Sequence, residues 1–225
     1  MFRGMRFSVI TITKNNSDGF QKTKQSVESQ NFSDFEWIVI DGDAMPDRGR
    51  YDAMNKGIAK AQGDYLIFMN AGDIFADQDV LTRLSPVKAD FIYGDAIVNK
   101  RVKKAKKVSA INGGMITSHQ AMIYNRKCLV QLEYDESYII AADYKFTLQF
   151  LKQVKNSVYC GFPVCIFESG GLSERQAGLA REEETYIRKE MGIASTCPAF
   201  RQYMAAVVKR LSPRLFMWMR HFIMR

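Results

Sequence analysis

Three aspartates stand where carboxylates could hold a cation or a phosphate-bearing ligand. Asp41, Asp73 and Asp95 each end or closely follow an apolar run that is typical of a buried strand. The carboxyl ends of parallel strands meet at one edge of an α/β sheet, and ligands bind there. Hard divalent cations take oxygen ligands and offset the charge of a leaving diphosphate. The three aspartates together predict a shared site, although a turn or capping role explains any single one.

Asp143 and His119 could carry further chemistry. Asp143 begins an expected helix, where it could act as a general base that takes the proton of an attacking hydroxyl. A capping role at the helix N-terminus is the alternative, and the sequence leaves both open. His119 stands in Thr-Ser-His-Gln-Ala at the entrance of an expected strand. Its polar neighbours fit a metal or phosphate role, and a structural hydrogen bond is the alternative.

Alternating strands and helices are needed to position these residues. The apolar pattern predicts strands at 7–13, 36–41, 65–70 and 90–95, with helices from about 16 to 30 and from about 51 onward. Beyond residue 95 it predicts shorter strands at 107–111, 120–124 and 158–167, and helices at 143–153 and 175–192. Strands that alternate with helices favour an α/β fold with a mostly parallel sheet.

Length and composition fit one globular domain with a tail. The chain has 225 residues, of which 47% are hydrophobic, enough for a sizeable core. No apolar run approaches the roughly 18 residues of a spanning helix, and no signal-peptide pattern opens the chain. We therefore expect a cytoplasmic protein. The four cysteines match no zinc or redox spacing, and no Gly-x-Gly-x-x-Gly follows the first strand, which disfavours a dinucleotide-dependent oxidoreductase.

The net charge of +8 is unevenly distributed. Six basic residues lie between Lys100 and Lys107, which we interpret as a solvated basic loop, and residues 201–225 contain no Asp or Glu. In that tail, apolar side chains recur at helical spacing among Lys and Arg, as in an interfacial membrane helix. A core-packing or dimerising helix is the alternative, so a homodimer stays open. We assign 1–195 to the globular domain and 196–225 to a membrane-associating tail. No nucleic-acid reader motif is visible, and no nucleic-acid partner is expected.

Several segments of the chain form recognisable motifs. They are Ser-Val-Ile-Thr-Ile-Thr-Lys-Asn at 8–15, Phe-Glu-Trp-Ile-Val-Ile-Asp-Gly at 35–42, Tyr-Asp-Ala-Met-Asn-Lys-Gly at 51–57, Ser-His-Gln-Ala at 118–121, Ala-Asp-Tyr at 142–144 and Glu-Ser-Gly-Gly-Leu-Ser at 168–173. These segments resemble glycosyltransferase family 2. The block at 51–57 is the most specific of them. The last three resemble a subgroup that builds colanic acid and related surface polysaccharides. The resemblance implies the GT-A fold, a mixed, mostly parallel sheet flanked by helices.

The resemblance also implies an activity and its residues. The activity is inverting transfer of a sugar from a nucleotide diphosphate sugar to a lipid-linked glycan, at the inner face of the bacterial cytoplasmic membrane, in surface polysaccharide biosynthesis. Asp143 would be the catalytic base, and Asp73 would hold Mn²⁺ or Mg²⁺, with His119 completing the shell. The residues assigned to the nucleotide sugar are Thr11, Thr13, Asn15, Asp41, Asp52, Asn55, Lys56, Asn70 and Asp95.

Two features separate the chain from the usual family pattern. The metal motif Asn-Ala-Gly-Asp at 70–73 keeps one carboxylate instead of a pair. Only residues 43–46 lie between the Asp-Gly at 41–42 and the Asp-x-Gly at 47–49, where the family has another helix and strand. The alternative function is therefore a catalytically silent binding or scaffold protein of a polysaccharide assembly complex.

Overall fold

The computed structural model describes residues 5–44, 47–167 and 176–193. The predicted tail helix and the segment at 168–173 lie outside the described residues. By its internal contacts the chain divides into two units, Met1–Glu184 and Thr185–Arg225. Of the second unit, only residues 185–193 are described. They include the end of a helix at Glu190, after which Gly192 has φ +67° and the amide N of Ile193 donates to the carbonyl of Arg188. The domain boundary at residue 195 stays a prediction.

The elements alternate as the sequence pattern predicts. The strands are β1 (Phe7–Thr13), β2 (Phe35–Asp41), β3 (Tyr65–Phe68), β4 (Ile74–Phe75), β5 (Phe91–Val98), β6 (Arg101–Lys103), β7 (Met122–Asn125) and β8 (Ser157–Phe167). The α-helices are α1 (Ser17–Glu28), α2 (Arg50–Lys60), α3 (Val80–Leu84), α4 (Ala142–Gln153) and α6 (Ala177–Glu190). Short 3-10 helices are η1 (Val108–Gly113), η2 (His119–Ala121) and η3 (Arg126–Cys128).

The strands form one mixed sheet in the order β2-β1-β3-β7-β5-β8-β4, with β6 added to β5. β1 pairs in parallel with both β2 and β3, whereas β7 runs antiparallel to β3 and to β5. β5 therefore runs in the same direction as β1, β2 and β3, and it pairs in parallel with β8. The predicted α/β class with a mixed, mostly parallel sheet is confirmed.

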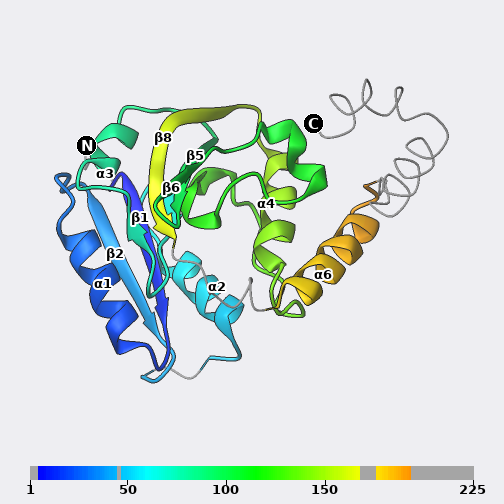
Figure 1. The fold of residues 1–225 in the computed structure, drawn as a ribbon, viewed down its shortest axis with the longest axis horizontal. Helices are drawn as coiled ribbons and strands as arrows, with labels where there is room; N and C mark the ends of the chain where they lie inside the picture. The colour runs from blue at the N-terminus through cyan, green and yellow to red at the C-terminus, as the bar shows by residue number, and fades with distance from the viewer. Residues whose placement is uncertain (1–4, 45–46, 168–175, 194–225) are drawn as a thin grey trace. The chain divides into compact units, whose positions relative to one another are not determined.

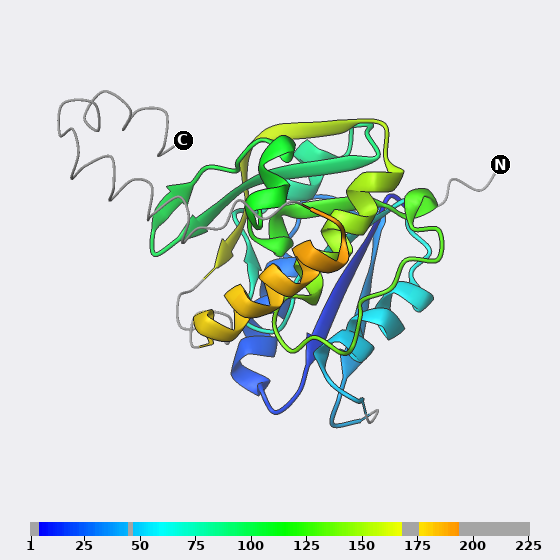
Figure 2. The same ribbon diagram turned by 90° about the vertical axis from the view of Figure 1, so that its right-hand side faces the viewer.

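α1 and α2 cover opposite faces of this sheet beside β1 (Figure 1, and again in the turned view of Figure 2). Phe7 and Val9 share a core cluster with Val27 of α1. Ile10 points the other way, because a Cβ added to Gly57 of α2 would meet its Cγ2 atom at 2.4 Å. Side chains alternate along a strand, so one short apolar strand packs against both helices.

Aromatic rings anchor α4 to the sheet. The Phe146 ring stacks on Tyr134 with centroids 4.3 Å apart and meets the edge of Tyr124 of β7 at 5.3 Å. Phe150, one turn later, packs against Tyr124 at 5.0 Å. Such pairs add about 0.5–1.5 kcal/mol each beyond their buried area. The body of α4 is therefore fixed independently of its first turn.

Three details of the sequence interpretation were wrong. Residues 107–111 form no strand, since η1 occupies this stretch and Ile111 is its one buried residue. The strand predicted at 120–124 starts only at Met122, after the turn of η2. Asp95 does not end its strand, because β5 continues to Val98 by pairing with β6. Residues 101–103 of the basic stretch thus form an edge strand, whereas residues 104–107 form the predicted loop.

The turn after β3 rests on Thr23 of α1. The Thr23 hydroxyl donates to the carbonyl of Asp73 at 2.7 Å and accepts from the amide N of Gly72 at 3.0 Å. Thr23 is fully buried. Gly72 has φ +105°, a conformation that favours glycine. The buried face of α1 thereby fixes the loop that carries Asp73.

We expect Thr23→Val to destabilise the protein. Valine keeps the shape of the side chain but removes the hydroxyl that donates to the Asp73 carbonyl, and a buried polar group that loses its hydrogen bond costs about 1–3 kcal/mol. Denaturant unfolding of the full chain measures the loss. Thr82→Val is the matched control, because the Thr82 hydroxyl donates to the carbonyl of Asn31 at an exposed position. Similar losses in both variants would contradict the role given to Thr23.

Candidate active site

A cleft of about 650 Å³ opens at the carboxyl end of β1. It lies where β1 has β2 on one side and β3 on the other, the place where open α/β sheets bind ligands. Residues from five parts of the chain line it: Ile12, Thr13, Lys14, Asn16, Asp47, Arg48, Gly49, Arg50, Ala53, Asn70, Ala71, Asp73, His119, Gln120 and Phe167. Among the predicted site residues, Thr13, Asn70, Asp73 and His119 line this cleft.

Asn15 and Asp41 belong to the loops beside the cleft without lining it. The amide N of Asn15 donates to Asp43 Oδ2 at 2.8 Å, and the amide N of Asp43 donates to Asp41 Oδ1 at 2.9 Å. Asn15 has φ +50°, so the chain turns sharply as it leaves β1. These contacts tie the loop after β1 to the loop after β2.

Thr11 and Asp95 lie away from the cleft. Thr11 is fully buried in β1, where its hydroxyl donates to the carbonyl of Met69 and accepts from Trp37 Nε1. Asp95 is also fully buried, and it accepts from Lys104 Nζ, the amide N of Ala105 and the Tyr159 hydroxyl. Burial opposes its ionisation, but these hydrogen bonds outweigh that effect and lower the pKa of Asp95. Asp95 therefore stabilises the β5–β6 hairpin by joining β5 to the residues that follow β6.

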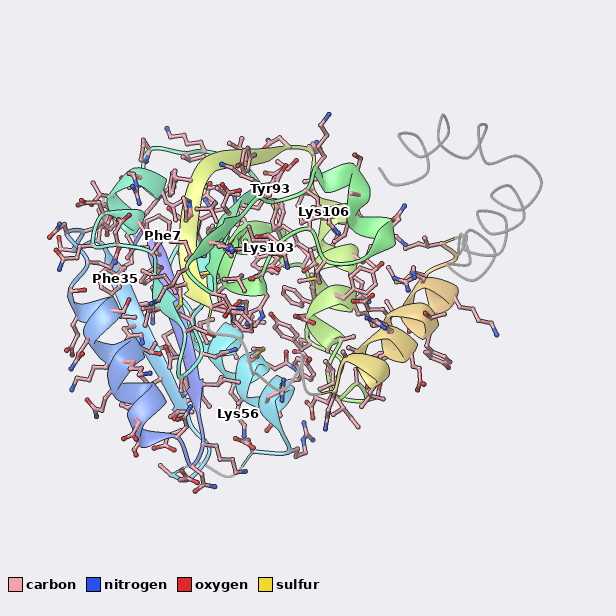
Figure 3. The ribbon with its side chains drawn as sticks, viewed as in Figure 1. Phe7, Phe35, Lys56, Tyr93, Lys103 and Lys106 are labelled. Atoms are coloured by element: carbon pink, nitrogen blue, oxygen red, sulfur yellow. The ribbon has the colours of Figure 1, made fainter. Side chains whose placement is uncertain are left out.

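Asp52, Asn55 and Lys56 of α2 are occupied by other protein groups. Asn55 pairs with the backbone of Tyr134, donating to its carbonyl at 2.9 Å and accepting from its amide N at 2.7 Å. Lys56, labelled in Figure 3, lies 2.8 Å from Asp52 Oδ2. The hydrogen bond from Lys56 lowers the pKa of Asp52, which also accepts from the amide N of Arg48. The most specific sequence block thus holds the segment that precedes α4.

Asp73 lines the cleft from the turn after β3. Burial raises the pKa of Asp73, and Gln120 Nε2 donates to its Oδ2 at 2.7 Å. Nearby, Asn70 Oδ1 is buried and has no hydrogen-bond partner in the described part of the chain. A carboxyl group and an unpaired amide oxygen that line one cleft are oxygen donors of the kind that a hard divalent cation takes.

Such a cation would need further ligands from outside the protein. Among the described residues, no three His, Cys, Asp or Glu side chains lie close enough together to form a metal site. Mg²⁺-type ions are commonly held by one or two carboxylates together with substrate phosphates and water. The residues present therefore fit a cation that arrives with a phosphate-bearing ligand.

His119 connects the turn after β3 with Asp143. Its Nε2 lies 3.1 Å from Asn70 Nδ2, and its Nδ1 lies 3.6 Å from Asp143 Oδ2. If Nε2 accepts from the amide, Nδ1 carries the proton and faces the carboxylate. The Asp143 side chain is 23% exposed, and its Oδ1 accepts from the amide N of Tyr144. One oxygen of Asp143 is thus oriented by the helix and the other faces His119.

The sequence interpretation missed the basic side chains of the cleft. Lys14 Nζ lies 3.2 Å from Asp47 Oδ1, and Arg48 pairs with Glu136 at 2.8 Å. Arg50 places its guanidinium 5.9 Å from the centre of the Tyr51 ring. Two arginines that flank Gly49 directly before the 51–57 block were the available signal. Three basic side chains against the two carboxyl groups of the lining, Asp47 and Asp73, favour an anionic ligand.

We expect Asp73→Asn to stabilise the ligand-free protein at pH 7. A carboxyl group whose pKa is raised by folding stabilises the fold while it is protonated, and this contribution is lost as the pH rises through the folded-state pKa. Asparagine keeps an oxygen that can accept from Gln120. The variant should melt a few degrees above wild type at pH 7, with the difference vanishing below the ordinary aspartate pKa of about 3.9.

Thermal unfolding as a function of pH checks this expectation. Asp18→Asn is the control, since Asp18 is exposed in the first turn of α1, where its charge favours the helix. Asp18→Asn should lower the melting temperature slightly or leave it unchanged. A lower melting temperature of Asp73→Asn at pH 7 would show that the charge of Asp73 does not destabilise the fold.

Comparisons with known proteins agree on one family. A sequence profile described as "Glycosyl transferase family 2" matches residues 44–162. An uncharacterized glycosyltransferase of Mycobacterium tuberculosis (strain ATCC 25618 / H37Rv) is 32% identical, over 75% of this chain and 77% of that protein. A PGL/p-HBAD biosynthesis glycosyltransferase of Mycobacterium bovis (strain BCG / Pasteur 1173P2) is 27% identical, over 74% and 78%.

Solved structures share the fold. S. aureus TarS 1-349 in complex with UDP-GlcNAc superposes with a TM-score of 0.67 at 18% identity, covering 92% of this chain and 72% of that one. A mannosyltransferase from Pyrobaculum calidifontis in complex with GDP-Man and Mn²⁺ superposes with a TM-score of 0.57 at 14% identity, covering 100% and 86%. The chain therefore belongs to glycosyltransferase family 2 and is a glycosyltransferase with the GT-A fold.

Proposed function

We propose that this glycosyltransferase moves a sugar from a nucleotide diphosphate sugar to an acceptor hydroxyl with inversion, using Asp143 as the base. The observation that carries the proposal is that one cleft contains Asp73, three basic side chains and His119, whose Nδ1 lies 3.6 Å from Asp143 Oδ2. Two structural neighbours were crystallised with nucleotide sugars, UDP-GlcNAc in one and GDP-Man in the other.

The donor would lie with its diphosphate over the turn after β3. Lys14, Arg48 and Arg50 of the lining would supply positive charge there. We place the nucleoside at the ends of β1 and β2, near Thr13, Asn15 and Asp41. Asp73 and Asn70 Oδ1 are the groups that would hold Mn²⁺ or Mg²⁺. Such a cation, when bound, offsets the negative charge that develops on the leaving diphosphate.

Asp143 would take the proton of the acceptor hydroxyl. As that oxygen attacks the anomeric carbon, it forms the new glycosidic bond, and the bond to the diphosphate breaks with its electron pair on the leaving oxygen. Attack from the side opposite the diphosphate inverts the configuration. His119 lies 3.6 Å from the carboxylate and would orient it, as would the amide N of Tyr144.

Nucleotide binding and turnover, measured on the same variants, test this function. A nucleotide diphosphate at a hundredfold excess over its Kd should stabilise the protein by about 2.7 kcal/mol, or roughly 5–10 °C. We expect such a shift with Mn²⁺ and one of UDP, GDP, dTDP or CDP in wild type and Asp143→Asn, and its loss in Asp73→Asn. Asp143→Asn should lose sugar transfer by about 100-fold or more.

Each result has a distinct meaning. A nucleotide shift in wild type with full turnover in Asp143→Asn would refute the base assignment. A shift that does not depend on metal would remove Asp73 from the cation role. The absence of any nucleotide shift would favour the alternative, a silent scaffold of a polysaccharide assembly complex.

We propose that the acceptor is a lipid-linked glycan and that the enzyme works at the inner face of the cytoplasmic membrane, in surface polysaccharide biosynthesis. In the described part of the chain, no helix has the length and apolarity to cross a bilayer. We propose that contact with the membrane involves the surface of this part together with the tail. The β5–β6 hairpin is the described feature that supports it.

The hairpin displays a rigid basic surface. Arg101, Lys103, Lys106 and Lys107 are exposed, and Val102 between them is 52% exposed (Lys103 and Lys106 are labelled in Figure 3). Asn99 and Lys100 form the tip with φ of 50° and 62°. Glycine is the usual second residue of such a turn, so the backbone of Lys100 is strained where its charge lies at the tip. β5 ends at the same edge of the sheet as β1, where the cleft opens.

We expect the hairpin to bind anionic lipid. Each basic residue near an anionic leaflet contributes roughly 1 kcal/mol, so K100Q/R101Q/K103Q should bind phosphatidylglycerol-containing vesicles at least about tenfold more weakly than wild type. Co-sedimentation of the full chain measures this, with phosphatidylcholine vesicles as background. K60Q/K127Q/K152Q removes the same charge from exposed positions elsewhere. Equal binding by the two triple variants would sink the hairpin's role.

A further inference from the structure

The carboxylate of Glu183, on α6, accepts hydrogen bonds from three consecutive backbone amides. Its Oε1 accepts from Ile139 N at 2.8 Å, and its Oε2 accepts from Ile140 N at 2.9 Å and Ala141 N at 2.8 Å. Hydrogen bonds to an ionised acceptor are about twice as strong as neutral ones. These three residues directly precede α4, in which Asp143 is the second residue.

A carbonyl of the same segment also has a side-chain partner. The Tyr51 hydroxyl of α2 donates to the carbonyl of Ile140 at 2.5 Å. Burial raises the pKa of Tyr51 far above its ordinary value, so the hydroxyl keeps its proton as a donor. The amides of residues 139–141 thus donate to the Glu183 carboxylate, and the carbonyl of Ile140 accepts from the Tyr51 hydroxyl.

The start of α4 has no capping side chain of its own. Ala141 is the N-cap residue, and it has no side chain that could cap the helix. Ile139 is 57% exposed, so apolar burial does not hold it. The aromatic contacts of Phe146 and Phe150 fix the helix further along. Ile140, Ala142 and Tyr144 are buried around the first turn, and Glu183 and Tyr51 add hydrogen bonds to the backbone that leads into it.

We propose that Glu183 is a positioning residue for the base Asp143. It fixes where α4 begins and thereby the distance between Asp143 Oδ2 and His119. The inference rests on the proposed function, since it takes Asp143 to be the base. Glu183 does not touch the cleft, so its loss should change the chemical step and leave donor binding intact.

Steady-state kinetics of Glu183→Gln test the proposal. Glutamine keeps the shape but removes the charge and turns one acceptor into a donor that faces an amide. We expect kcat to fall about tenfold or more, because small misplacements of reacting groups cost up to about 100-fold. The donor KM should stay within about twofold, and the nucleotide-induced thermal shift should be unchanged. Glu182→Gln, at an exposed neighbour on the same helix, should behave like wild type.

A purely structural role predicts a different pattern. Glu183→Gln would then melt at a lower temperature but keep its kcat when assayed well below that temperature, and this result would overturn the proposal. If Glu183→Gln does not fold, Tyr51→Phe decides, since it releases the same segment from the other side. A wild-type kcat in Tyr51→Phe would then overturn it. Asp143→Asn separates a failure of the positioning role from a failure of the base assignment, because full turnover in this variant refutes Asp143 as the base.

Discussion

The parallel pairing of β1 with β2 on one side and β3 on the other is the constraint on which the site depends. Connections between parallel strands are right-handed, so two crossovers that leave in opposite directions put α1 and α2 on opposite faces. The chain segments above β1 must then diverge, and the cleft forms between them. Phe7, Val9 and Ile10 make this arrangement stable, since they are fully buried against the two faces.

The cleft concentrates groups that burden the fold. Asp73 has its pKa raised by burial, Asn70 Oδ1 lacks a partner in the described residues, and Gly72 takes a left-handed conformation. Strain of this kind persists only where the surroundings over-determine the structure. Thr23 does so here, because its single buried hydroxyl bonds both sides of the turn. In the proposed reaction, a divalent cation would offset the negative charge of Asp73.

α2 connects the two halves of the candidate site. Its N-terminal end brings Arg48 and Arg50 to the donor side of the cleft. Its Tyr51 and Asn55 hold the chain between Tyr134 and Ile140, which leads into α4 and Asp143. A helix whose sequence is the most specific in the chain therefore contributes mainly by holding backbone. Such a block can be recognisable because two distant segments must be kept in register.

The sequence by itself determined the order of strands and helices, the α/β class and the residues of the turn after β3, because local alternation and turn chemistry decide these features. It also singled out His119 and Asp143. Tertiary structure decided which of the predicted residues meet. Asp95 and Thr11 are sealed inside the sheet, since β6 pairs with β5 and Trp37 lies beside Thr11. Asn55 meets Tyr134 and Glu183 meets Ile139 across long sequence separations. Contacts of this kind depend on how whole elements pack, which no local pattern encodes.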